Sequence, residues 1–154
     1  MSVLKDSSIT IYEALQNIKN GKYVMPAFQR QYVWSMEQIE KLWDSILLDY
    51  PKATFLFWHV DDDNVSWDTY FCNFLSDVTF DSGKQADSVN YELTGINVNM
   101  TDTAVLDGQQ RLTSLYLSLL GDAYIRQKHA RKKNNGGFVT KLLIELNKNK
   151  LDVD

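Results

Sequence analysis

The residues best suited to chemistry lie in segment 105–113, which reads VLDGQQRLT. A short apolar run ends at Asp107, Gly108 permits a tight turn, and the apolar spacing that follows predicts a helix. The first turn of a helix carries unpaired N–H groups and the positive end of the helix dipole, so it can bind an anion. Arg111 would lie in this first turn, where a basic residue is unfavourable unless an anion is bound there. The segment therefore predicts a phosphate site.

A carboxylate and two amides complete the set of groups that a nucleotide phosphate requires. Asp107 could hold Mg²⁺, while Gln109 and Gln110 add amide donors and acceptors. A purely structural alternative is that Asp107 caps the helix and pairs with Arg111, because aspartate is a common N-cap residue. The chain contains neither GxxxxGK[ST] nor GxGxxG, so neither of these phosphate-binding loops is expected.

A second segment, 25–34, reads MPAFQRQYVW and has neither helical nor strand periodicity. It surrounds Gln29 and Arg30 with aromatic and aliphatic side chains, and a loop this apolar must pack against something. We expect this packing to hold Arg30 in place, where it would act as a second phosphate clamp near a helix N-terminus. For Tyr32 and Trp34 the alternative role is simple packing in the core.

The elements that must position these segments begin with two predicted helices. Residues 10–13 and 35–38 are both capping boxes, which mark helix starts. The first helix should end at Gly21 and the second near residues 49–51. The apolar face of the second helix consists of Ile39, Leu42, Trp43, Ile46 and Leu47.

Several apolar runs predict strands. Segment 54–60, TFLFWHV, predicts a buried strand in which His59 is a packed core residue, and 104–106 predicts a short buried strand. Segment 66–90 fits either one helical face or a pair of short strands, and 138–146 predicts a final strand. The helix after Gly108 should end at Gly121, with these residues facing inward: Leu112, Leu115, Tyr116, Leu119 and Leu120. The mixture predicts an α+β domain.

Charge is unevenly distributed along the chain. Acidic and basic residues balance in 1–60, whereas 61–107 holds ten acidic residues and one basic residue. Segment 108–154 holds nine basic and four acidic residues, so it is basic. The basic residues cluster at Arg126, Lys128, Arg131, Lys132 and Lys133. Such a cluster attracts phosphate or DNA, although a solvated helix end or loop is the alternative interpretation.

Composition excludes several other classes of protein. The single cysteine, Cys72, excludes an internal disulfide, and two histidines make a histidine-based zinc site improbable. The triplet 61–63, DDD, lacks the spaced ligands of a calcium loop, so we interpret it as a solvated turn. The N-terminus does not resemble a signal peptide and no apolar run is long enough to cross a membrane. We therefore expect a soluble, cytoplasmic domain.

Segments 25–34 and 106–121, in this order and with a capped helix between them, resemble the N-terminal domain of the GmrSD-type restriction endonuclease family. The resemblance covers roughly residues 8–150. It implies a ParB/sulfiredoxin-like α+β fold with a small mixed sheet and packed helices. Family members usually carry a proline after the QR pair, whereas this chain has Gln31, a difference that affects the rigidity of the loop more than its chemistry.

The resemblance also implies a nucleoside triphosphate as ligand or substrate, with Mg²⁺ as cofactor. By motif, the catalytic residues would be Asp107, Gln110 and Arg111, with Asp107 also the metal ligand. Tyr32 and Trp34 would support the loop. The nucleotide-binding residues would be Gln29, Arg30, Gly108, Gln109 and Thr113.

Full-length family members typically add a C-terminal HNH-type nuclease domain and cut modified phage DNA. The HNH signature does not occur in residues 1–154, so we expect a single domain of a longer protein that does not cut DNA by itself. The expected partners are nucleotide, DNA and a nuclease domain or subunit, and a homodimer is one expected assembly. Two alternatives stay open: a DNA-binding module that uses the basic cluster without hydrolysis, and an interaction scaffold for a nuclease.

Overall fold

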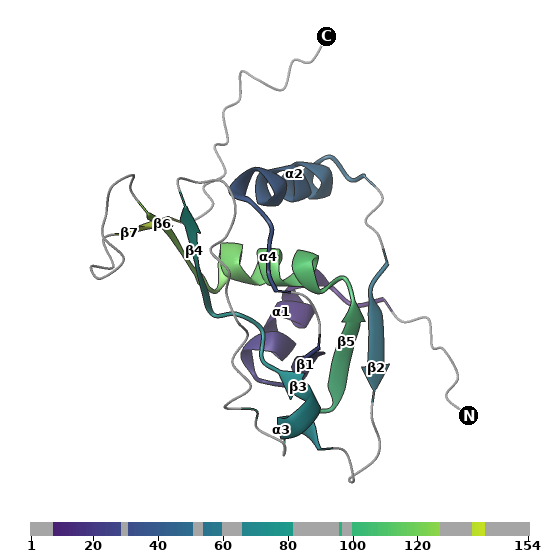
Figure 1. Ribbon diagram of the computed structural model, residues 1–154. Helices are drawn as coiled ribbons and strands as arrows, with labels where there is room; N and C mark the ends of the chain where they lie inside the picture. Colours follow the sequence, from purple (N-terminus) through teal and green to yellow (C-terminus); the bar gives the residue numbers. More distant parts are fainter. Residues whose placement is uncertain are drawn as a thin grey trace.

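The computed structural model combines helices with mixed sheets, so the predicted α+β class is confirmed (Figure 1). The structure describes residues 8–28, 31–50, 54–59, 66–81, 96, 100–126 and 137–140. In this part of the chain, no helix is long and apolar enough to cross a membrane.

The larger sheet has four strands: β1 (Tyr23–Pro26), β2 (Leu56–His59), β3 (Phe71–Cys72) and β5 (Thr103–Asp107). Their order in the sheet is β2-β5-β1-β3, which places β5 between β1 and β2. β1 runs parallel to β5, whereas β2 runs antiparallel to β5 and β3 antiparallel to β1. The carboxyl ends of β1 and β5 therefore lie at the same edge of the sheet as the beginning of β2.

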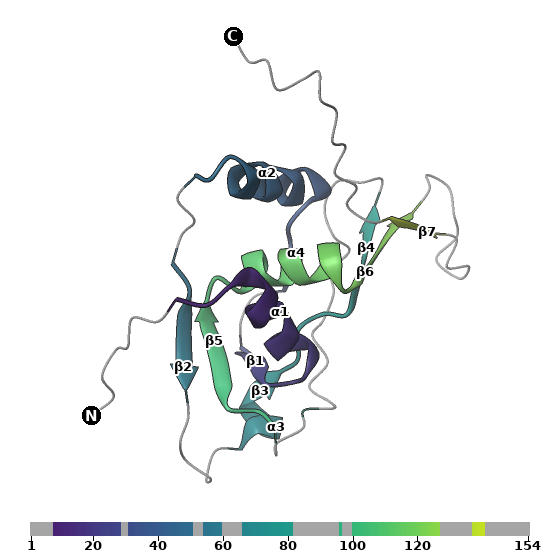
Figure 2. The same ribbon diagram turned by 180° about the vertical axis from the view of Figure 1, so that it is seen from behind.

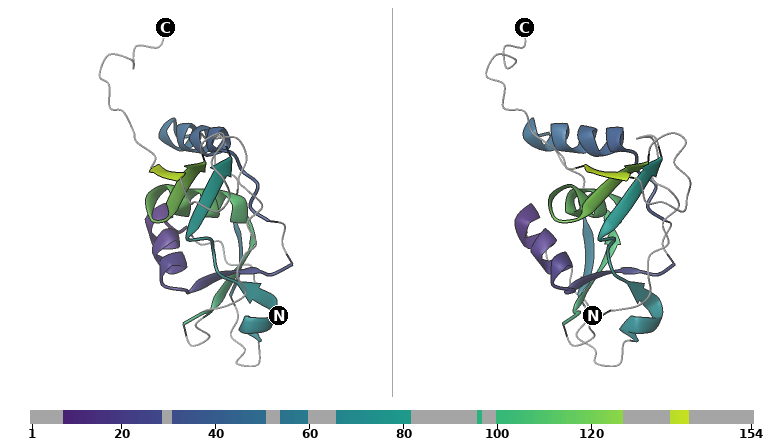
Figure 3. Two further views of the ribbon diagram at one scale, coloured as in Figure 1. Left: turned by 60° about the vertical axis from the view of Figure 1, so that its left-hand side comes forward. Right: turned by 90° about the vertical axis from the view of Figure 1, so that its left-hand side faces the viewer.

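The smaller sheet consists of β4 (Asp77–Asp81), β6 (Asp122–Arg126) and β7 (Gly137–Thr140). β6 lies in the middle, parallel to β4 and antiparallel to β7. Figure 3 shows β4 and β6 side by side next to α4, the helix Gln109–Leu119. Because α4 follows β5 and precedes β6, it connects the two sheets.

Three further helices surround this framework: α1 (Ile11–Lys19), α2 (Met36–Leu47) and the single turn α3 (Trp67–Tyr70). Both predicted capping boxes are confirmed, since Thr10 pairs with Glu13 and Ser35 with Gln38 through side chain and backbone. α1 and α2 both contact α4, and Figure 2 shows α1 beside β1 and below α4.

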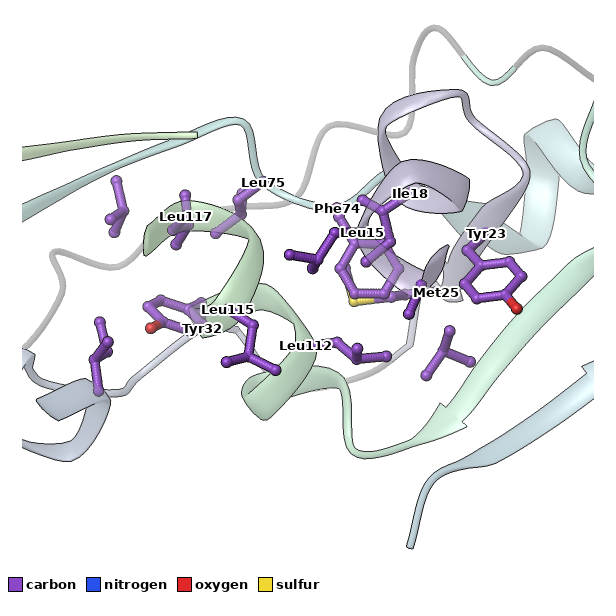
Figure 4. Close-up of a cluster of buried hydrophobic side chains, with 14 of the residues drawn as sticks. Leu15, Ile18, Tyr23, Met25, Tyr32, Phe74, Leu75, Leu112, Leu115 and Leu117 are labelled. Atoms are coloured by element: carbon purple, nitrogen blue, oxygen red, sulfur yellow. The ribbon is translucent and has the colours of Figure 1, made fainter. Parts of the chain in front are cut away.

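The main core forms around α4, whose Leu112, Leu115 and Leu117 are buried (Figure 4). Side chains from α1, β1, the loop before α2 and the segment around β3 pack against them, including Leu15, Ile18, Met25, Tyr32, Phe74 and Leu75. α4 is therefore held from several sides, which fixes its first turn relative to the sheet.

The predicted burial is wrong for β2 and for the end of α4. β2 is not buried, because it is the outer strand of its sheet, and the side chain of His59 is 59% exposed. At the end of α4, Leu119 and Leu120 are exposed rather than inward. The core contains Leu117 instead, because α4 is covered most completely around its middle.

The segment after residue 66 contains a short helix followed by strands β3 and β4, which is nearer to the predicted strand pair than to one long helix. Strand β6 was not predicted. Segments 61–63, 82–95, 127–136 and 141–154 lie outside the described residues. Most of the basic cluster belongs to segment 127–136 and therefore lies outside them too. Arg126 is the last residue of β6.

Gly121 allows the end of α4 to approach the segment before β4. A Cβ atom at this position would lie 2.7 Å from the Ser76 carbonyl oxygen and 3.0 Å from Leu117 Cα. We expect Gly121→Ala to lower the free energy of unfolding by about 1–3 kcal/mol, because backbone atoms must move to make room. Urea unfolding measures this loss, with Leu119→Ala as a half-exposed control. A Gly121→Ala variant as stable as the wild type would contradict this close approach.

Candidate phosphate site

The topology of the larger sheet brings the two sequence motifs to one edge. Segment 25–34 leaves the carboxyl end of β1, and the DGQQR segment leaves the carboxyl end of the parallel neighbour β5 (Figure 1). Ligands of mixed sheets commonly bind at such an edge, where loops from neighbouring parallel strands meet. The start of β2 reaches the same edge, since Leu56 pairs with Asp107.

The turn between β5 and α4 depends on a glycine. Gly108 is the N-cap of α4 and has a φ of +87°, a left-handed conformation that side chains rarely adopt. A Cβ atom here would lie only 2.3 Å from Cδ1 of Phe55, so the aromatic ring needs the space that the glycine leaves. Among the described residues, no side chain caps this helix. The structural alternative is therefore wrong in making Asp107 the N-cap, whereas its other half, the pairing of Asp107 with Arg111, is present as a loose ion pair.

Arg111 is held firmly in the first turn of α4. Its side chain is 19% exposed, and Nη2 donates a hydrogen bond of 3.1 Å to the Thr54 carbonyl. The guanidinium carbon lies 4.9 Å from the centre of the Phe55 ring, which is a cation–π distance. Within the part of the chain that the structure describes, Nη1 is buried and has no hydrogen-bond partner. The site thus contains a fixed positive charge with one unused donor group.

Asp107 is the exposed carboxylate of the site. It ends β5, its side chain is 71% exposed, and Oδ2 lies 3.9 Å from Arg111 Nη2, a loose ion pair. Across the described residues, no group of three histidine, cysteine, aspartate or glutamate side chains could hold a metal ion. Mg²⁺ often binds through one carboxylate, with phosphate and water oxygens as its other ligands. Asp107 fits this mode of binding.

Gln110 joins the two motifs directly. Its Oε1 accepts a hydrogen bond of 3.1 Å from the Val33 N–H, and its Nε2 donates one of 3.1 Å to the Gln31 carbonyl. Gln109 turns the other way, and its Nε2 donates to the carbonyls of Val105 and Leu106 at the end of β5. Both amides, expected from sequence to contact a ligand, are engaged with the protein backbone in this structure.

Tyr32 extends this connection into the core. Its hydroxyl lies 2.8 Å from Ser114 Oγ, and Ser114 Oγ donates to the Gln110 carbonyl at 2.7 Å. The Tyr32 hydroxyl therefore donates to Ser114, and burial raises the pKa of Tyr32 to about 12. Ser114 was missed from the sequence, although it lies one helical turn after Gln110 and on the same face. The supporting role predicted for Tyr32 matches this arrangement.

The remaining predicted site residues are partly or fully buried, or lie outside the described residues. Trp34 is partly buried and packs against the core. Thr113 is fully buried, and its hydroxyl, like Arg111 Nη1, has no hydrogen-bond partner among the described residues. Gln29 and Arg30 lie outside the described residues. Phe55 and Thr54, which hold Arg111, were not predicted because they lie just before β2, far from Arg111 in the chain.

Comparison with known proteins identifies the family. The family model described as GmrSD restriction endonuclease, N-terminal domain, matches residues 11–153. The chain belongs to this family. The GmrSD resemblance of the two sequence motifs is thereby confirmed, and the match also covers the region between them.

A relative of this GmrSD domain occurs in Methanocaldococcus jannaschii as an uncharacterized protein. The two sequences are 28% identical over 116 residues, which cover 75% of this chain and 18% of the relative. The chain thus spans less than a fifth of the length of that relative. The family-model match places this domain in a restriction endonuclease family.

We expect Gln110→Ala to detach the loop from α4. The Val33 N–H loses its acceptor, so the free energy of unfolding should fall by roughly 1 kcal/mol. Hydrogen exchange at the Val33 amide should become faster, because this amide would no longer be bonded. Gln109→Ala is the matched control, since among the described residues the Gln109 side chain bonds to the carbonyls of β5 and not to the loop. Unchanged exchange at Val33 in Gln110→Ala would argue against the connection.

Tyr32 should make the domain sensitive to alkaline pH. Its pKa rises from the usual value of 10.0 to about 12 in the folded protein, because burial disfavours the phenolate. The resulting stabilisation is complete below pH 10 and is lost as pH rises towards 12, since the unfolded chain ionises first. Unfolding measured from pH 8 to 12 should therefore show a shallower decline for Tyr32→Phe than for the wild type. Burial also raises the pKa of Cys72, to about 11, so part of the decline should persist in this variant. Identical slopes for the two proteins would contradict the assignment.

Proposed function

We propose that this GmrSD N-terminal domain binds a nucleoside triphosphate with Mg²⁺ at the start of α4 and hydrolyses it. One observation carries the proposal: the buried Nη1 of Arg111 has no partner among the described residues, and it belongs to the first turn of a helix that no side chain caps. In a restriction system, nucleotide binding and hydrolysis would regulate cleavage of modified phage DNA by a nuclease partner.

The energetics favour an anion at this place. A buried donor without a partner costs about 1–3 kcal/mol, and more when the group is charged. The positive end of the α4 dipole adds to this cost for a cation in the first turn. A phosphate oxygen would satisfy the Arg111 donor and the first N–H groups of α4 together. A phosphate ligand would therefore lower the free-energy cost of keeping this donor buried without a partner.

The residues at this edge would have different roles in phosphoryl transfer. Asp107 would orient Mg²⁺ or the attacking water, and Arg111 would neutralise negative charge on the phosphates in the transition state. Gly108 would let the phosphates approach the backbone closely, because it has no side chain. When bound, Mg²⁺ would shield the charge of the phosphate oxygens.

Gln110 acts as a positioning residue in this proposal. Its side chain holds the backbone of Gln31 and Val33, and Gln31 directly follows Arg30 in the chain. Arg30 as a second phosphate clamp stays a prediction, and so does DNA binding by the basic cluster. The phosphate site is supported by the contacts that hold Arg111 and Gln110 in place.

Thermal unfolding with nucleotide tests the proposal. Mg²⁺ with ATP, GTP, CTP or UTP at about 100 times the dissociation constant should add roughly 2.7 kcal/mol of stability for at least one nucleotide. Asp107→Ala and Arg111→Ala should abolish this gain, since they remove the carboxylate and the fixed cation. Lys22→Ala is the control, because Lys22 pairs with Asp102 at the opposite end of β5.

Two results would refute the site. A well-folded wild type that gains no stability from any of the four nucleotides would contradict nucleotide binding. An Arg111→Ala variant that gains as much as the wild type would show that the nucleotide binds elsewhere.

A further inference from the structure

Phe28 is the most exposed of the large apolar side chains described, with 82% of its surface accessible. The residues before it, Met25 and Pro26, are fully buried, and so is Tyr32 after it. The sequence interpretation that the whole loop packs against the protein is therefore wrong for Phe28. The loop is anchored on both sides of a phenylalanine that faces solvent.

The anchors place Phe28 near the phosphate site. The N–H of Ala27 donates a hydrogen bond of 2.8 Å to the Tyr70 carbonyl, and the Gln31 carbonyl accepts one from Gln110. Three residues of extended chain span about 10 Å at most, so Phe28 lies within this distance of Gln31. Gln110 in turn precedes Arg111 in the first turn of α4. Phe28 is thus linked to the phosphate site through a short stretch of chain and the Gln110 side chain.

We propose that Phe28 is the surface on which the base of the bound nucleotide stacks, an inference that rests on the proposed function. A phenyl ring has neither a hydrogen-bond donor nor a positive charge with which to bind a phosphate, whereas its face can stack on a planar base. The polar groups at the same edge, Asp107 and Arg111, suit the phosphates, and the Phe55 ring beside them is already covered by the Arg111 guanidinium. The two ends of a nucleotide would thus meet different chemistry: charge and N–H groups at α4, and an aromatic ring at the loop.

Isothermal titration separates the two ends of the ligand. The probes are inorganic triphosphate and the β,γ-imido analogues of ATP, GTP, CTP and UTP, each with Mg²⁺. Phe28→Ala should weaken nucleotide binding roughly 10- to 100-fold, the effect of losing one base–aromatic stack, and leave triphosphate binding unchanged. Phe28→Trp should restore nucleotide binding, because indole stacks at least as well. Tyr12→Ala is the matched control, since Tyr12 lies on α1 and is 72% exposed.

The outcomes distinguish this inference from the proposed function. If the wild type binds neither triphosphate nor nucleotide, the proposed function fails and stacking fails with it. If the wild type binds nucleotide and Phe28→Ala binds it equally well, only the stacking role is overturned. An equal loss of triphosphate and nucleotide binding would show that Phe28 merely supports the loop.

Discussion

The hydrogen bonds of the Gln110 side chain connect segments that lie 77 and 79 residues apart in the chain. They fasten the loop after β1 to the first turn of the helix after β5, and Tyr32 with Ser114 repeats the connection one turn further on. The parallel pairing of β1 and β5 makes this contact possible, because it brings both loops to one edge of the sheet. Without this parallel pairing, the loop after β1 and the turn before α4 would form two separate surfaces.

Arg111 provides the fixed positive charge at that edge of the sheet. A cation in the first turn of a helix opposes the dipole, yet here Phe55 and the Thr54 carbonyl keep it in place. The same ring occupies the space beside Gly108, so the glycine, the ring and the guanidinium form one packed unit. Membership in the GmrSD restriction endonuclease family gives this unit a biological setting. In the proposed nucleotide site, a phosphate oxygen would give Arg111 Nη1 the partner that it lacks among the described residues.

Local features of the sequence were predicted well. Both capping boxes, the short strand before Asp107 and the turn at Gly108 depend on neighbouring residues, and the structure confirms them. Features that depend on distant residues were not predicted. Periodicity cannot show that β2 is an outer strand, which is why His59 was wrongly placed in the core. Periodicity also cannot show that the Gln110 amide bonds to the protein backbone rather than to a ligand, because the loop that it bonds to follows a different strand, β1.

A crystal structure of the domain with Mg²⁺ and a non-hydrolysable nucleoside triphosphate analogue tests most directly whether the nucleotide binds at the start of α4. If it does, phosphate oxygens lie within hydrogen-bonding distance of Arg111 Nη1 and of the first backbone N–H groups of α4. Phosphates bound at another surface, with Arg111 Nη1 still without a partner, would contradict binding at the start of α4.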